Sequence, residues 1–215
     1  MHIGLDVNAR IADFFRALAL GERLAQDCAR RQSDFALDPK MRRFLKRQAQ
    51  QEAFHALVLE GAGVVMDSRR NTATPLIHAL QAYDARLESD LDARRLASSL
   101  LGMQVILEGI GAVVLEKMDL SLSTQHSPRF VPFRRLLLQQ EDMHHAFGLR
   151  TLEQIIADDP EQMAALRAAA RDYLPLARNL LFACSDLFAH FDSNAEDYSA
   201  SLEQHLPRWL LAPAP

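Results

Sequence analysis

The sequence contains two Glu-x-x-His motifs, Glu52 to His55 and Glu141 to His144. On a helix, residues three positions apart share a face, so each motif presents one carboxylate and one imidazole together. Each motif also follows a single glutamate in an apolar helical pattern: Glu22 stands 30 residues before Glu52, and Glu108 stands 33 residues before Glu141. Four glutamates and two histidines in this order are typical of a dinuclear metal site inside a helical bundle.

The apolar neighbours of these residues explain why metal binding is the expected chemistry. Small and apolar side chains surround Glu22 and Glu108 at spacings of three, four and seven residues, which places both carboxylates on the core side of their helices. Buried carboxylates that lack compensating charge are very costly, and two divalent cations would supply that charge. Carboxylate and imidazole ligands suit iron, and they serve manganese or a mixed iron and manganese pair equally well. We therefore expect two iron ions, with manganese as the alternative.

The elements that must position these ligands are helices throughout, so the expected fold class is all-α. Asp38-Pro39, Thr74-Pro75 and Asp159-Pro160 each place a capping residue before a proline at the first helical position. Segment 121–129 is the clearest loop. The predicted helices are 9–32, 39–66, 75–89, 91–119 and 130–157, followed by 160–173, 175–191 and 195–205.

The lengths of the connections predict the topology. Short turns join 9–32 to 39–66 and 91–119 to 130–157, so each pair should be antiparallel. About 25 residues separate the two pairs, which is enough for one long crossover along a four-helix bundle. We expect one domain over 1–215, with the bundle at 9–157 and a helical C-terminal extension at 160–205.

The ligand constellation resembles that of the ferritin-like superfamily of carboxylate-bridged di-iron proteins. This superfamily includes bacterioferritins, rubrerythrins, ribonucleotide reductase small subunits, aldehyde-deformylating oxygenases and hydroxylases of modified adenosine in tRNA. The resemblance covers residues 10–157 and implies that the six residues of the first paragraph are the metal ligands. The 58 residues beyond this region make the layout most similar to that of the small di-iron oxygenases.

Two further features of the bundle helices bear on the site. Gln51 and Gln140 directly precede the two motif glutamates, and we expect them to orient the ligand histidines, although they could equally be ordinary surface residues. Three glycines at 102, 109 and 111 weaken the third bundle helix. Close helix contact, space for a substrate or a local π-bulge would each account for them. We expect Phe14, Phe54 and nearby aromatic residues to line an apolar substrate pocket.

Composition restricts the setting and the partners. Cys28 and Cys184 are too few for a disulfide scaffold, which favours a reduced, cytoplasmic environment. No C-x-x-C motif is present, so rubredoxin-type iron is excluded and electrons must come from an external ferredoxin or reductase. A net charge of −4 gives no general reason to expect nucleic acid as a partner. No apolar run approaches the roughly 18 residues that a membrane helix needs, so we expect no membrane span.

The function expected from these observations is that of a non-haem di-iron oxidase or oxygenase. It would use O2 to oxidise a small organic substrate held in the apolar pocket. The alternative is iron handling, as a ferroxidase and storage protein or a peroxide scavenger. A third reading is a helical interaction protein that binds no metal. The C-terminal extension argues against a standard ferritin cage and leaves room for a homodimer.

Overall fold

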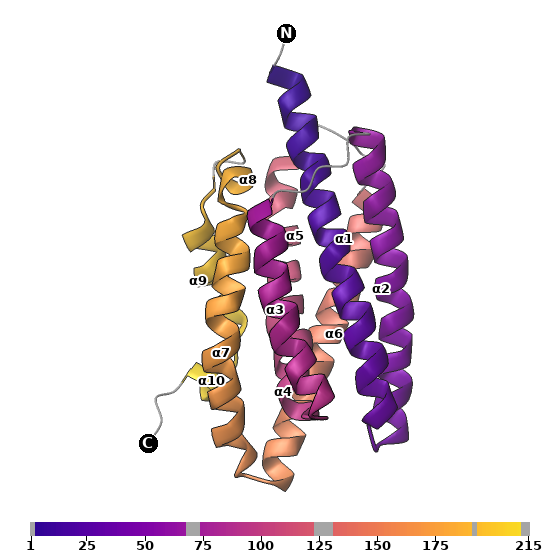
Figure 1. Cartoon of the computed structure of the whole chain (residues 1–215), viewed down its shortest axis with the longest axis vertical. Coiled ribbons are helices and arrows are strands. Elements are labelled where there is room, and N and C mark those ends of the chain that lie inside the picture. The colour runs from indigo at the N-terminus through magenta and orange to yellow at the C-terminus, as the bar shows by residue number, and fades with distance from the viewer. Residues whose placement is uncertain (1–2, 68–73, 123–130, 191–192, 212–215) are drawn as a thin grey trace. The chain divides into compact units, whose positions relative to one another are not determined.

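The computed structural model describes residues 3–67, 74–122, 131–190 and 193–211 (Figure 1). All elements in these ranges are helices, and none of the described residues lies in a strand. The predicted all-α class is therefore confirmed. By their internal contacts the residues group into two compact units, Met1–Arg94 and Arg95–Pro215. The prediction of one domain over 1–215 stays a prediction.

In the first unit, α1 (Ile3–Phe35) and α2 (Pro39–Met66) form an antiparallel pair. Asp38 caps α2 by accepting hydrogen bonds from the backbone N–H groups of Lys40 at 3.0 Å and Met41 at 3.2 Å. Further along the pair, the Arg23 guanidinium donates to both carboxylate oxygens of Glu60, at 3.0 and 2.7 Å. The predicted cap and the predicted start of the helix at 39 are confirmed.

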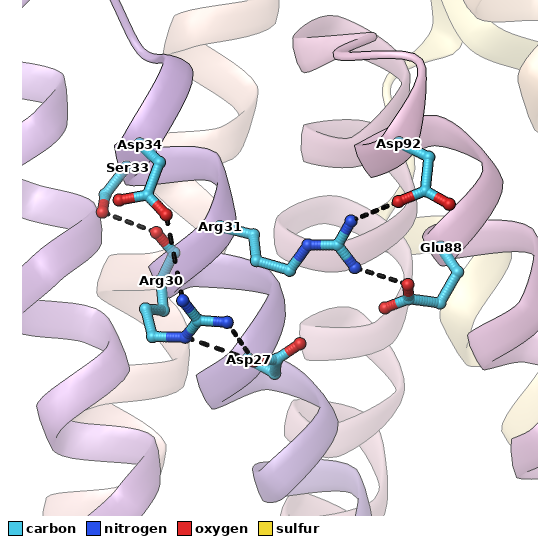
Figure 2. Close-up of polar contacts among 7 residues, drawn as sticks. All are labelled: Asp27, Arg30, Arg31, Ser33, Asp34, Glu88 and Asp92. Atoms are coloured by element: carbon cyan, nitrogen blue, oxygen red, sulfur yellow. Dashed lines mark hydrogen bonds and ion pairs between the residues drawn. The ribbon is translucent and has the colours of Figure 1, made fainter.

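The third helix of this unit, α3 (Thr74–Asp92), packs against α1. Arg31 of α1 reaches across to the carboxylates of Glu88 and Asp92, the latter at 2.6 Å (Figure 2). Both carboxylates are more than a third exposed, and such pairs contribute about 0.2–1 kcal/mol. Tyr83 and Leu87 of α3 are fully buried, and burying one such side chain contributes about 1.5–3 kcal/mol. Apolar burial therefore holds α3 in place more than the ion pairs do.

In the second unit, α4 (Leu96–Leu100), the π-helix η1 (Leu101–Leu107) and α5 (Glu108–Leu122) follow one another without a break. They lie antiparallel to α6 (Val131–Asp158), because Arg134 donates to the Leu115 carbonyl at 3.1 Å while Gly148 lies against Gln104. The predicted helix start at 91 is wrong. Arg94 adopts a left-handed φ of 51°, which interrupts helical geometry between α3 and α4. The predicted loop at 121–129 lies outside the described residues from 123 onwards.

The predicted C-terminal helix at 195–205 is confirmed, whereas the boundaries predicted at 160–173 and 175–191 differ from those of the structure. The C-terminal helices are α7 (Gln162–Ala183), α8 (Ser185–His190), α9 (Ala195–His205) and α10 (Arg208–Leu211). The predicted break at Pro175 is wrong, because α7 continues through it. A proline inside a helix removes one hydrogen bond, yet Tyr173 and Ala177 on either side are fully buried and hold the helix in register. Helix α7 ends instead at Ala183, and the N–H of the next residue, Cys184, donates to the carbonyls of Leu181 and Phe182.

The helical run from Leu96 to Lys117 is long and apolar enough, by length and composition alone, to cross a membrane. The expectation that no run would reach this length is therefore wrong. In the structure, 78% of its most apolar window is buried. The central helix of a packed bundle is apolar on all sides and passes the same test.

Candidate metal centre

The first unit brings Glu22 of α1 together with Glu52 and His55 of α2. The Nδ1 atom of His55 lies 3.0 Å from Oε2 of Glu52 and 3.2 Å from Oε2 of Glu22. Glu52 and His55 are fully buried, and the side chain of Glu22 is 13% exposed. The three predicted ligands in this unit therefore meet at one buried point, and we call them the first triad.

The first triad holds two carboxylates around one imidazole. Burial lowers the pKa of His55, but hydrogen bonds to Glu22 and Glu52 and the charges of both carboxylates outweigh it and raise that pKa to about 11. The imidazole is consequently in its doubly protonated, positively charged form between the two carboxylates. A metal ion bound at the same point would replace one of these protons, as metal binding to such ligands generally does.

The second unit brings Glu108, at the start of α5, towards His144 of α6. Glu141 lies three residues before His144 on the same face of α6. We call these three residues the second triad. The Nδ1 atom of His144 lies 3.8 Å from Oε1 of Glu108. All three residues are buried, and Oε2 of Glu141 lies 3.9 Å from the position of a Cβ built on Gly111. Glu141 therefore faces α5 one turn after Glu108. The second triad repeats the composition and the helical spacing of the first.

The π-helix η1 sets the position of Glu108. The backbone N–H of Glu108 donates to the carbonyl of Met103, five residues earlier, which is the hydrogen-bond pattern of a π-helix. A π-bulge in this helix was one of three explanations for its glycines, and it is confirmed. Close contact is confirmed as well, since a Cβ on Gly102 would lie 2.4 Å from the ring of Tyr173.

The distances within the triads suit metal ligands. Oxygen and nitrogen ligands lie about 2.0–2.2 Å from a divalent ion. Two ligands of one ion that subtend an angle between about 90° and 130° are then about 3.0–3.8 Å apart. The carboxylate–imidazole separations of 3.0, 3.2 and 3.8 Å fall within this range. The described residues therefore include buried Glu and His clusters compatible with metal binding.

Several glutamines stand close in sequence to the glutamates of the two triads. Gln51 and Gln140 are partly buried, and their role beside the histidines stays a prediction. Gln48 and Gln104 were not among the expected site residues, and they are fully buried four residues before Glu52 and Glu108 respectively. The four-residue spacing places each of them on the ligand face of its helix, and this signal was available in the sequence.

Phe54 does not contribute to an apolar pocket. Its side chain is 50% exposed, because it lies two residues and therefore about 200° from Glu52 around α2. Phe14, by contrast, is buried in α1 as expected. The prediction that Phe54 lines a substrate pocket is wrong.

His145, next to the ligand position 144, is partly buried, and its ring lies beside Gly109. Burial and the nearby charge of His205 lower the pKa of His145. An imidazole with a lowered pKa is neutral at physiological pH, which suits a packed side chain.

Comparison with known proteins yields no relative: no family model matches the chain, and no curated protein matches it.

Proposed function

We propose that the chain is a ferritin-like, non-haem di-iron oxidase or oxygenase whose two triads together hold two iron ions. The observation that carries the proposal is that buried carboxylates and imidazoles gather within each unit. Glu22, Glu52 and His55 meet in the first unit, and Glu108 lies near His144 in the second, where the buried Glu141 stands three residues before His144. Because a buried carboxylate is costly without a positive partner, four of them with two imidazoles favour two divalent cations. Manganese would satisfy the same ligands.

The proposed roles of the side chains follow from their positions. Glu22 and Glu108 each come from a helix that carries one ligand, while the Glu-x-x-His motifs supply a carboxylate and an imidazole from α2 and α6. Bound iron would supply the redox chemistry and the open coordination positions that O2 activation requires. The protein's own contribution is to fix the ligands within an apolar core and to exclude bulk water from them.

The small ligand number is consistent with an oxidase or oxygenase. Six protein ligands for two ions leave positions for O2 and for a substrate. The proposed substrate is a small organic molecule. Reducing equivalents would come from a ferredoxin or a reductase, since the sequence carries no C-x-x-C motif.

Glutamate-to-glutamine substitution tests the assignment. Glu52→Gln and Glu141→Gln remove one buried charge each while keeping the shape of the side chain. We expect iron binding to fall from two ions per chain to one or none, and substrate-dependent O2 consumption to be lost. The matched controls are Glu60→Gln on α2 and Glu153→Gln on α6, both outside the triads, which should keep full loading.

Thermal unfolding without metal separates a metal role from a structural one. In the Glu52→Gln variant His55 stays paired with Glu22, so the metal-free Gln variants should remain folded with a Tm near that of the metal-free parent. Iron should raise the Tm of the parent and of the controls but not of the triad variants. Full iron loading in both triad variants would refute the proposal. Accumulation of many ferric ions per chain would instead favour iron storage.

A further inference from the structure

The face of α2 that points away from the first triad carries cations along its N-terminal part. Lys40, Arg43, Lys46 and Arg47 are all exposed. Within the described residues none of the four forms an ion pair at 4 Å or less. The charges of Lys40 and Arg43 contribute to lowering the pKa of Asp38. Residues 38–47 hold five basic side chains and one acidic side chain, in a chain with a net charge of −4.

This charge distribution opposes the local helix. The N-terminus of a helix carries a partial positive charge and is stabilised by acidic residues, whereas the first turn of α2 contains none. Asp38 at the N-cap is the acidic residue at this end of α2, and five basic side chains stand within residues 38–47 beside it. An external partner that carries negative charge would offset the repulsion among them.

The same face continues as an apolar surface along the second half of α2. Phe54, Leu57, Val64 and Val65 are 50%, 65%, 49% and 88% exposed. At 100° per residue, the four exposed cations and these four apolar residues fall on one side of the helix. The buried residues Leu45, Glu52 and Leu59 fall on the opposite side. We call the exposed side the outer face of α2.

An apolar patch with a charged margin has the composition of a protein docking site. Interfaces have an apolar centre enriched in aromatic residues and a polar rim, and complementary charge at the rim guides association. The cations are grouped at one end of the outer face and do not line both sides of the apolar stripe. A helix that lies on a membrane surface has its cations along the whole stripe. The arrangement therefore favours a protein partner with a carboxylate cluster beside an apolar patch.

We propose that the outer face of α2 docks an acidic electron-transfer protein of the ferredoxin type. That the partner carries electrons rests on the proposed function, which needs an external reductant. Arg47 precedes Glu52 by five residues, or about 7.5 Å along the helix axis, so a partner bound here lies one helix width from two ligands of the first triad. The docked donor would deliver electrons one at a time and leave in its oxidised form.

Direct binding tests the surface without any metal. The probe is an oxidised plant-type [2Fe–2S] ferredoxin, and its binding to the metal-free chain is measured by surface plasmon resonance at 20 and 200 mM NaCl. We expect saturable binding whose Kd rises about tenfold or more with the added salt. Arg43→Glu/Lys46→Glu/Arg47→Glu should weaken binding about tenfold or more at low salt, and Leu57→Ser should weaken it at both salt concentrations.

The matched control is Arg135→Glu/Arg171→Glu/Arg178→Glu, which changes the net charge equally at exposed positions of the second unit. This control should bind with a Kd within about twofold of the parent. Absence of binding at 20 mM NaCl, or an equal loss in the control, would overturn the proposal. So would a concentration-dependent dimer that the charge-reversed outer face abolishes. Phosphatidylserine vesicles that bind the parent but not the outer-face variant, with ferredoxin unaffected, would identify a membrane surface instead.

Failure of this proposal is distinguishable from failure of the proposed function. Reduction of the iron-loaded chain by dithionite needs no docking and tests the metal centre alone. A chain that loads iron and is reduced by dithionite but does not bind ferredoxin would refute the docking surface only. A chain that binds ferredoxin through the outer face but holds no iron would refute the di-iron function only.

Discussion

Replacing Gly102 by alanine should destabilise the protein, although alanine is the better helix former. A Cβ at this position would lie 2.4, 2.6 and 2.9 Å from the Cζ, Cε1 and Cε2 atoms of Tyr173. The ring cannot move outward easily because Tyr173 is fully buried. Overpacking of a filled core costs about 1–3 kcal/mol. The helical propensity of alanine returns about 1 kcal/mol.

The expected net effect of Gly102→Ala is a loss of up to about 2 kcal/mol in the free energy of unfolding. For a chain of this length each kcal/mol corresponds to about 2–4 °C, so the Tm should fall by up to about 8 °C. Circular dichroism during thermal unfolding and urea titration of the metal-free protein both measure the change. Tyr173→Leu in the same chain should recover part of the loss, because the smaller side chain vacates the space that the new methyl group needs.

Gly61→Ala is the matched control. A Cβ at Gly61 would meet nothing within 4 Å, so only the gain in helix propensity remains. This variant should be more stable than the parent by about 0.5–1 kcal/mol. If Gly102→Ala were stabilised as much as Gly61→Ala, the close packing of Tyr173 on η1 would be refuted.

Two other predictions address the thiols and the cap of α2. Cys28 is buried and Cys184 is partly buried. Burial raises the pKa of Cys28 and raises that of Cys184 to about 12. At pH 8 iodoacetamide should therefore alkylate both at least about a hundredfold more slowly than glutathione, and equal rates in the folded protein would contradict the raised pKa values. Asp38→Ala should lower the Tm at neutral pH. Hydrogen bonds from the Lys40 and Met41 N–H groups lower the pKa of Asp38 in the folded protein. The difference in Tm between the parent and Asp38→Ala should therefore shrink as the pH falls below the ordinary pKa of 3.8. A Tm difference that persists in acid would contradict the capping role.

Helix positions could be predicted where the signal is local. The Asp38-Pro39 pair sets the start of α2 through bonds within one turn, and the observed bounds of that helix match the predicted 39–66. Pro175 shows the limit of such signals. Its local preference for ending a helix is overridden by burial of Tyr173 and Ala177, which depends on packing partners distant in sequence.

The grouping of the ligands within each unit could be predicted for a similar reason. The spacing of Glu52 and His55 fixes their common face, and the apolar neighbours of Glu22 place it towards α2. The partial exposure of Glu22 and the longer distance between His144 and Glu108 depend on how the helices pack, and periodicity carries no such information. The outward direction of Phe54 was available from the same periodicity and was overlooked.

The central claim, that both triads hold one pair of iron ions, is tested most directly by anomalous diffraction at the iron edge from crystals of the iron-loaded chain. The account predicts two iron peaks about 3.5–4 Å apart, with ligands from Glu22, Glu52 and His55 and from the second triad around them. A single peak, no peak, or two peaks each bound by one triad and well separated from the other would contradict it.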